Sequence, residues 1–179
     1  MISGPSGVGK STIAKNLGTA GIPRVMTTTT RPPRGTEKNG VEYRFLTRAE
    51  FENEIRQGKF LEYAEIGGNL YGTPKEWIEQ ELKSRPVVLV DIDTQGAASI
   101  RSMGLPALFV FIAPPDMGEL RKRLEGRKTE SPEQLKIRLE RADREMSQKD
   151  TYDAVVVNST VEQAVDEILK LARARKLLS

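Results

Sequence analysis

The chain has 179 residues, 37% of them hydrophobic and 30% charged, which predicts one globular domain of residues 1–179. It contains no cysteine and no histidine, which excludes a disulfide framework, a thiol nucleophile, an imidazole base and a typical zinc centre. The net charge of +3 is local, because residues 121–144 hold nine basic residues against five acidic ones. One basic segment suits a polyphosphate clamp better than a nucleic-acid-binding face, so we expect no nucleic-acid partner.

The first element in the chain is a phosphate-binding loop between a strand and a helix. Residues 2–3 end the strand, residues 4–11 read GPSGVGKS, and residues 12–17 begin the helix. The glycines let successive backbone N–H groups turn toward a polyphosphate, and the helix dipole favours the same anion. Lys10 is expected to reach the β- and γ-phosphates, and Ser11 to hold Mg²⁺. The residues predicted to bind ATP here are Gly4, Pro5, Ser6, Gly7, Val8, Gly9, Lys10, Ser11 and Thr12.

Strands and helices alternate after this loop. Short apolar segments at residues 24–26, 87–91, 108–112 and 154–157 have the composition of strands buried on both faces of a parallel sheet. Capping patterns open helices at Thr47, Thr73, Asp116, Ser131 and Thr160, with Pro74 at the first helical position of the second. The alternation predicts an α/β fold, a doubly wound parallel sheet in which ligands bind at the carboxyl ends of the strands.

Two stretches interrupt the alternation. Residues 27–73 are rich in Thr, Arg, Gly and Tyr, and residues 121–144 form the basic helical segment. A phosphoryl transferase needs an acceptor site and a cover that excludes water. We therefore expect a P-loop kinase core of residues 1–26, 74–120 and 145–179, an acceptor-binding insertion at 27–73 and a helical lid at 121–144. The longest apolar run, residues 105–115, is too short to span a bilayer and no signal peptide precedes the loop, so we expect no membrane partner and a cytoplasmic location.

Two further groups carry charge suited to phosphate chemistry. Asp91 ends an apolar strand, where its carboxylate can hold Mg²⁺ directly or through water; the alternative is a simple strand-end cap. Arg31 and Arg34 lie three residues apart around Pro32 and Pro33, and arginine forks match phosphate oxygens. The alternative for this pair is a solvated basic turn, but the preceding threonines and the nearby tyrosines favour an anion pocket.

Eight blocks of sequence, in order and at matching spacing, resemble guanylate kinases. They are GPSGVGKS at 4–11, TTRPPR at 29–34, GVEYRF at 40–45, FLEY at 60–63, GNLYGT at 68–73, DIDTQG at 91–96, RLEGR at 123–127 and YDAVVVN at 152–158. The resemblance covers essentially the whole chain. It implies transfer of the γ-phosphoryl group of ATP to GMP, with Mg²⁺ as cofactor and ATP and GMP as the small-molecule partners.

The resemblance also implies roles for individual residues. The GMP phosphate would be bound by Arg31, Arg34, Tyr43 and Tyr71, and the guanine by Thr27, Glu62, Thr73 and Asp93. Glu62 can accept from guanine N1–H and the 2-amino group, and the two threonine hydroxyls can donate to O6. Lys10, Arg127 and Arg138 would neutralise the migrating phosphoryl group as catalytic residues, and Asn158 would lie near the adenine. The alternative for Arg127 and Arg138 is ordinary solvated helix charge.

The chain departs from the usual family pattern in two places, and several functions stay open. Thr27 stands where Ser is common, and Gly35 and Thr36 stand where a Pro-Gly pair is usual. A kinase of a phosphorylated sugar would have no use for the guanine-reading residues. A phosphopeptide-binding scaffold of the same fold typically loses the phosphate loop, and a nucleotide-driven switch would need a partner surface. Both a monomer and a homodimer are compatible with the sequence.

Overall fold

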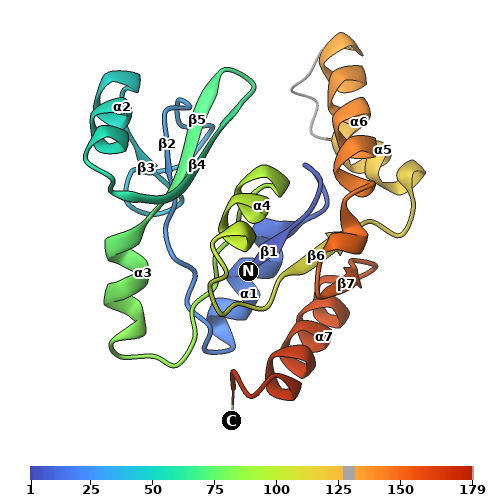
Figure 1. Cartoon of the computed structure of the whole chain (residues 1–179). Coiled ribbons are helices and arrows are strands. Elements are labelled where there is room, and N and C mark those ends of the chain that lie inside the picture. The colour runs from blue at the N-terminus through green and yellow to red at the C-terminus, as the bar shows by residue number, and fades with distance from the viewer. Residues whose placement is uncertain (127–131, 179) are drawn as a thin grey trace.

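The structure is a computed structural model of the chain, and it describes residues 1–126 and 132–178. Figure 1 shows a core of parallel strands and helices at the centre, a second strand-rich part at the upper left, and the helix pair α5 and α6 at the right. The elements in chain order are β1 (Ile2–Ser3), α1 (Lys10–Thr19), β2 (Thr28–Thr29), β3 (Arg44–Phe45), α2 (Arg48–Arg56), β4 (Phe60–Ile66), β5 (Asn69–Pro74), α3 (Lys75–Leu82), α4 (Thr94–Ser102), β6 (Val110–Ala113), α5 (Met117–Glu125), α6 (Pro132–Met146), the 3₁₀ turn η1 (Lys149–Thr151), β7 (Ala154–Val157) and α7 (Val161–Ala174).

The core is a parallel sheet with helices on both faces. Strands β1, β6 and β7 pair in parallel in that spatial order. Two shorter segments extend the sheet beyond β1 through parallel bridges, from Ile2 to Asp91 and from Leu89 to Arg24. One buried cluster joins the sheet to α1, α5 and α7, and a second joins the other face to α3 and α4. The predicted doubly wound sheet is therefore confirmed.

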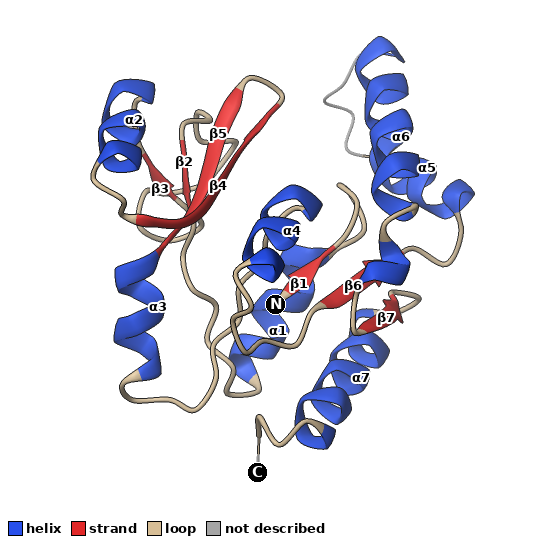
Figure 2. Cartoon of the chain, viewed as in Figure 1, coloured by secondary structure: helices blue, strands red, loops and turns tan. Residues whose placement is uncertain are grey.

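The second part is a four-stranded sheet with its own small core. Its strand order is β3-β2-β5-β4, with β4 and β5 forming an antiparallel hairpin. Phe51 of α2 stacks on Phe60 of β4 with ring centroids 4.4 Å apart. Figure 2 shows this sheet beside α2, apart from the parallel strands of the core. These strands fall within the stretch 27–73 that the sequence singled out, except for Pro74, the last residue of β5.

Several local predictions are confirmed and others are corrected. Strand 154–157 and the Thr47 capping box are as predicted, and Asp116 and Thr160 also cap their helices. Segments 24–26 and 87–91 form single bridges instead of continuous strands. The predicted cap at Thr73 is wrong. Thr73 is the penultimate residue of β5, where it pairs with Glu62 of β4, and Pro74 is the N-cap of α3. The cap predicted at Ser131 lies outside the described residues.

The core of the second part gives a test of packing. A Cβ atom added at Gly72 would lie 2.9 Å from Phe51 Cζ and 2.9 Å from Phe60 Cδ1. Gly72→Ala is expected to lower the free energy of unfolding by about 1–3 kcal/mol through overpacking. Gly18→Ala in α1 is the control, because a Cβ there meets nothing within 4 Å, and it should add up to about 1 kcal/mol through helix propensity. Urea unfolding measures both, and a Gly72→Ala protein as stable as the wild type would contradict the packing described.

Candidate active site

The phosphate loop has a backbone conformation that requires glycine at three positions. Gly4, Gly7 and Gly9 have φ angles of +139°, +89° and +99°. A Cβ atom at Gly4 would collide with the Ile112 carbonyl, and one at Gly7 would lie 2.7 Å from Leu124 of α5. Gly9 is the N-cap of α1 and no side chain caps that helix, so its first N–H groups are left for an anion.

Lys10 and Ser11 are the first two residues of α1, directly after the glycines of the loop. In the ligand-free chain the Lys10 ammonium folds back on the loop and donates to the carbonyls of Gly4 at 2.6 Å and Pro5 at 3.2 Å. The Ser11 side chain is exposed and makes no hydrogen bond within the described part of the chain. Thr12 is likewise exposed, Ser6 is partly exposed and Val8 is fully buried. An incoming triphosphate would therefore meet a lysine that can exchange carbonyl partners for phosphate oxygens.

Asn158 supports the phosphate loop through a hydrogen bond to its backbone. Its side-chain amide is buried and donates to the Val8 carbonyl at 2.7 Å, and its Nδ2 would lie 2.5 Å from a Cβ at Gly9. Arg123 of α5 also reaches the loop, donating to the carbonyls of Val8 at 3.5 Å and Asn158 at 3.2 Å. The observed contacts of Asn158 are thus to the loop backbone, and its place near the adenine stays a prediction.

Asp91 lies beside the phosphate loop with a partner that the sequence did not suggest. The Arg24 guanidinium is 3.9 Å from the carboxylate, and Lys10 is close enough to act on it electrostatically. Burial raises the pKa of Asp91 and the two cations oppose that shift. Among the described residues no three acidic side chains gather into a metal cage. Mg²⁺ usually keeps its waters and binds through one or two protein ligands plus phosphates, so Ser11 and Asp91 fit an ion that arrives with ATP.

Glu62 and Thr73 form a buried pair on neighbouring strands. The Thr73 hydroxyl donates to Glu62 Oε1 at 2.5 Å, and Glu62 and Thr73 are 7% and 0% exposed. Glu62 Oε2 faces Gly96 of α4, where a Cβ atom would lie only 2.5 Å away. Burial, with a smaller contribution from the Asp93 charge, raises the pKa of Glu62 to about 7, although the Thr73 hydrogen bond opposes the shift. A hydroxyl group has one proton to donate, and in the ligand-free chain Thr73 donates it to Glu62.

Asp93 and Thr27 complete the residues predicted to read the base. Asp93 is the N-cap of α4 and its Oδ1 accepts from the N–H groups of Gln95 at 2.7 Å and Gly96 at 3.0 Å. Thr27 is buried just before β2. Asp93 acts electrostatically on Glu62, so these two carboxylates, contributed by the core and by the second part, are neighbours.

Three of the four residues predicted to bind the phosphate, Arg31, Tyr43 and Tyr71, lie together. The Arg31 guanidinium lies 5.4 Å from the centre of the Tyr43 ring, and Tyr43 and Tyr71 meet edge-on with centroids 6.3 Å apart. Arg31 is almost fully buried, whereas Arg34 is exposed. Burial raises the pKa of Tyr43, and its hydroxyl also lies within electrostatic reach of Asp91. Of the predicted lid residues, Arg138 lies on α6, and Arg127 lies outside the described residues.

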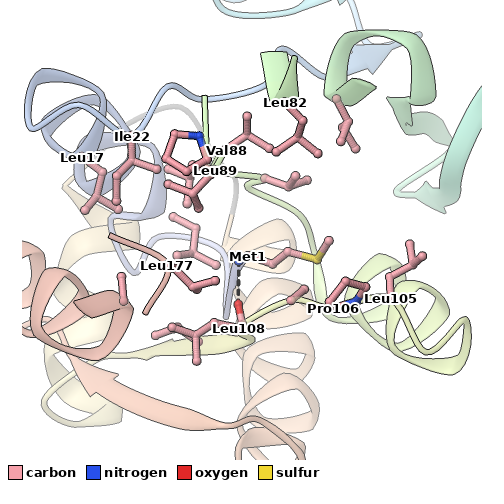
Figure 3. A pocket seen from close by; sticks show the side chains of 18 of the residues that line it. Met1, Leu17, Ile22, Leu82, Val88, Leu89, Leu105, Pro106, Leu108 and Leu177 are labelled. Atoms are coloured by element: carbon pink, nitrogen blue, oxygen red, sulfur yellow. Dashed lines mark hydrogen bonds between the residues drawn. The ribbon is translucent and has the colours of Figure 1, made fainter. Parts of the chain in front are cut away.

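An apolar cavity of about 400 Å³ lies away from these groups. Figure 3 shows Leu17, Leu89, Leu108 and Leu177 among the residues that line it, with the Met1 amine donating to the Leu108 carbonyl at 2.7 Å. It contains none of the predicted site residues. In addition, no helix of the described residues has the length and apolar character of a membrane span.

Comparisons with known proteins agree with this arrangement. A family model described as guanylate kinase matches residues 1–175. The chain belongs to the guanylate kinase family. A guanylate kinase from Rubrobacter xylanophilus is 43% identical over 97% of this chain and 92% of its own, and one from Thermobifida fusca is 45% identical over 97% and 90%. The crystal structure of guanylate kinase from Anaplasma phagocytophilum, 33% identical, superposes with a TM-score of 0.80 over 99% of this chain and 85% of that one.

Three residues of this guanylate kinase family member were not foreseen. Glu37 pairs with Arg31, Arg24 pairs with Asp91, and Gly96 leaves room for Glu62. Glu37 lies three positions after Arg34, and this spacing could have suggested a turn that brings its carboxylate back to the two arginines. A glycine in the first turn of a helix could have suggested close packing. No sequence signal connects Arg24 with Asp91, which are 67 positions apart.

The buried Glu62 carboxylate gives a prediction on stability and pH. Its pKa is about 7 in the folded chain and close to 4.5 when unfolded, so the unfolded state binds fewer protons and stability falls as pH rises from about 4.5 to 7. Glu62→Gln keeps an acceptor for Thr73 and removes the charge. It is expected to stabilise the protein by up to about 3 kcal/mol at pH 8, and by much less at pH 5. Urea unfolding of both proteins at the two pH values measures this, and a gain that is equal at pH 5 and pH 8 would contradict it.

Proposed function

We propose that the chain transfers the γ-phosphoryl group of ATP to GMP, giving ADP and GDP, between the phosphate loop and the acceptor residues described above. The observation that carries the assignment of sites is a continuous set of interacting groups. The charge of Lys10 acts to lower the pKa of Asp91, and the charge of Asp91 raises the pKa of Tyr43. The Tyr43 ring in turn packs on the Arg31 guanidinium. These neighbouring groups link the donor lysine to the acceptor arginine, and this linkage supports assigning both to one site, as phosphoryl transfer requires.

The acceptor side has the chemistry to select guanine. The ionised Glu62 can accept two hydrogen bonds from N1–H and the 2-amino group, which adenine does not offer at the same edge. Since Thr73 already donates to Glu62, we assign the O6 contact first to Thr27 and the orientation of Glu62 to Thr73. Asp93, held as a helix cap, keeps Oδ2 available to the base amine.

The reaction needs charge neutralisation more than a base. The acceptor is already an ionised phosphate, so no imidazole is required. Lys10 and the lid arginines Arg127 and Arg138 would neutralise the transferring group, and Arg31, Arg34, Tyr43 and Tyr71 would hold the acceptor. Mg²⁺ would be held by Ser11 and, through water, by Asp91, and it would screen the charges of the ATP phosphates. A cytoplasmic location and a monomer or homodimer also remain predictions.

The alternatives are less well supported by the site. The intact loop, with an exposed Ser11 and an uncapped α1, disfavours a scaffold that has lost nucleotide binding. A buried carboxylate whose pKa is raised by burial is costly to keep, and a sugar phosphate would make no use of it.

The first prediction of this proposal concerns the acceptor. With Mg-ATP, the protein should phosphorylate GMP faster than AMP by a factor of up to about 10⁴, because AMP leaves the buried Glu62 unpaired. A coupled assay for ADP formation with GMP, AMP, CMP and UMP measures the preference. Equal rates with GMP and AMP would contradict the assignment of Glu62.

The second prediction separates donor from acceptor. Arg34→Ala should raise KM for GMP by a factor that corresponds to about 2–3 kcal/mol and leave KM for ATP nearly unchanged, because a charge-assisted phosphate contact is lost on the acceptor side only. Arg56→Ala, an exposed arginine at the end of α2, is the matched control and should change neither value. A rise in KM for ATP with Arg34→Ala would place this arginine on the donor side instead.

A further inference from the structure

The Arg31 guanidinium forms an ion pair with one carboxylate, that of Glu37. Glu37 Oε2 is 2.9 Å from Arg31 Nη1 and Glu37 Oε1 is 3.0 Å from Nη2, a bidentate pair. The arginine is 6% exposed, and Tyr43 and Phe45 place their rings 5.4 Å and 5.8 Å from its guanidinium carbon. Although burial would lower the pKa of Arg31, the Glu37 hydrogen bond and charge outweigh that effect and raise it.

The remaining donors of this guanidinium are on one edge. Nη1 donates to the Pro32 carbonyl at 2.7 Å and forms an ion pair with Glu37 Oε2 at 2.9 Å, and Nη2 donates to Glu37 Oε1 at 3.0 Å. An arginine has five N–H donors, so the Nε–H and the second Nη2–H are left for the side-chain hydrogen bond to Tyr71 and for a ligand. In a planar fork these two point in the same direction and form a second bidentate face. Tyr71 acts on the same guanidinium, so the second face lies among the residues predicted to hold the acceptor phosphate.

Glu37 also fixes the turn that carries Arg34. Its Oε2 accepts from the Arg34 backbone N–H at 2.7 Å, and its own N–H donates to the Arg34 carbonyl at 2.9 Å. Gly35 between them has a φ of +53°, a conformation that glycine adopts readily. One carboxylate therefore sets both the side-chain orientation of Arg31 and the backbone position of Arg34.

We propose that Glu37 is a positioning residue for the acceptor phosphate, holding Arg31 so that its second face, together with Arg34, is ready to receive the phosphate of GMP. The inference rests on the proposed function and adds to it a residue that does not touch the substrate. Glu37 takes the terminal edge of the Arg31 fork and leaves the lateral edge for the nucleotide. It thereby keeps the buried guanidinium satisfied before GMP arrives, so that no reorientation is needed on binding.

The opposite role would be competition, in which Glu37 occupies the phosphate's place. Two observations favour positioning. The edge that Glu37 uses is distinct from the edge that remains, and Arg31 is too buried to stay in place with an unpaired charge once Glu37 is removed. The Glu37 side chain is itself 23% exposed, so solvent weakens its repulsion of a phosphate.

The test compares Glu37→Gln with Glu42→Gln. Glu42 is the matched control because it lies in the same loop and its carboxylate caps a backbone N–H, that of Lys38 at 2.7 Å, as Glu37 caps Arg34. Calorimetry gives Kd for GMP and a chemical-shift titration gives Kd for guanosine, which has no phosphate. Steady-state kinetics gives KM for ATP and kcat, and thermal unfolding confirms that each variant is folded.

Glu37→Gln is expected to weaken GMP binding by about 10-fold to 100-fold, with guanosine binding and KM for ATP unchanged within twofold. Glu42→Gln should bind GMP like the wild type. The inference is overturned if Glu37→Gln binds GMP as tightly as the wild type or more tightly, or if it loses guanosine to the same extent as GMP. A wild-type protein that does not bind GMP at all would instead contradict the proposed function, so the two failures are distinguishable.

Discussion

The two parts of the molecule meet at a buried carboxylate, and the acceptor site depends on how that charge is accommodated. Glu62 comes from the hairpin of the second part and faces Gly96 on α4 of the core, with the Thr73 hydroxyl as its hydrogen-bond partner. Burial raises its pKa to about 7, so keeping it ionised costs stability in the ligand-free chain. A base that offers two N–H groups to this carboxylate would recover that cost. At Glu62, the ionised carboxylate suited to binding a base thus lowers the stability of the ligand-free chain. Such a conflict between binding and stability is common at sites that bind a specific partner.

In the proposed function, mainly backbone groups would bind the phosphates on the donor side, and side chains would bind the phosphate on the acceptor side. Asn158 and Arg123 hold the loop from Gly4 to Gly9 through the Val8 carbonyl, to which both side chains donate. On the acceptor side Arg31 is buried with Glu37 as its counter-charge. The Val8 carbonyl on the donor side and the Arg31 charge on the acceptor side are therefore paired before any nucleotide binds. This pre-organisation is what electrostatic catalysis of phosphoryl transfer requires, because little covalent chemistry is left for the protein to perform.

The sequence predicts those features that depend on local pattern. The glycines of the phosphate loop, the alternation of strands and helices, and the capping box at Thr47 are all encoded within a few residues, and the structure agrees with them. Thr73 shows where such reasoning fails, because strand pairing with Glu62, 11 residues away, keeps it in β5 and Pro74 becomes the N-cap. The pairing of Arg24 with Asp91 and the fit of Glu62 against Gly96 arise from contacts between distant segments. No periodicity or motif in one sequence specifies contacts of that kind.

The central claim is that the donor loop and the acceptor residues face one space and pass a phosphoryl group directly between two nucleotides. Its most direct measurement is a single-turnover quench experiment with excess enzyme, Mg²⁺, ATP labelled with ³²P in the γ-phosphate, and unlabelled GMP. The account predicts that the label appears in GDP at the rate at which it leaves ATP, with almost none in inorganic phosphate. Label released as inorganic phosphate at the same rate with and without GMP would contradict it, because the chain would then hydrolyse ATP and have no acceptor site.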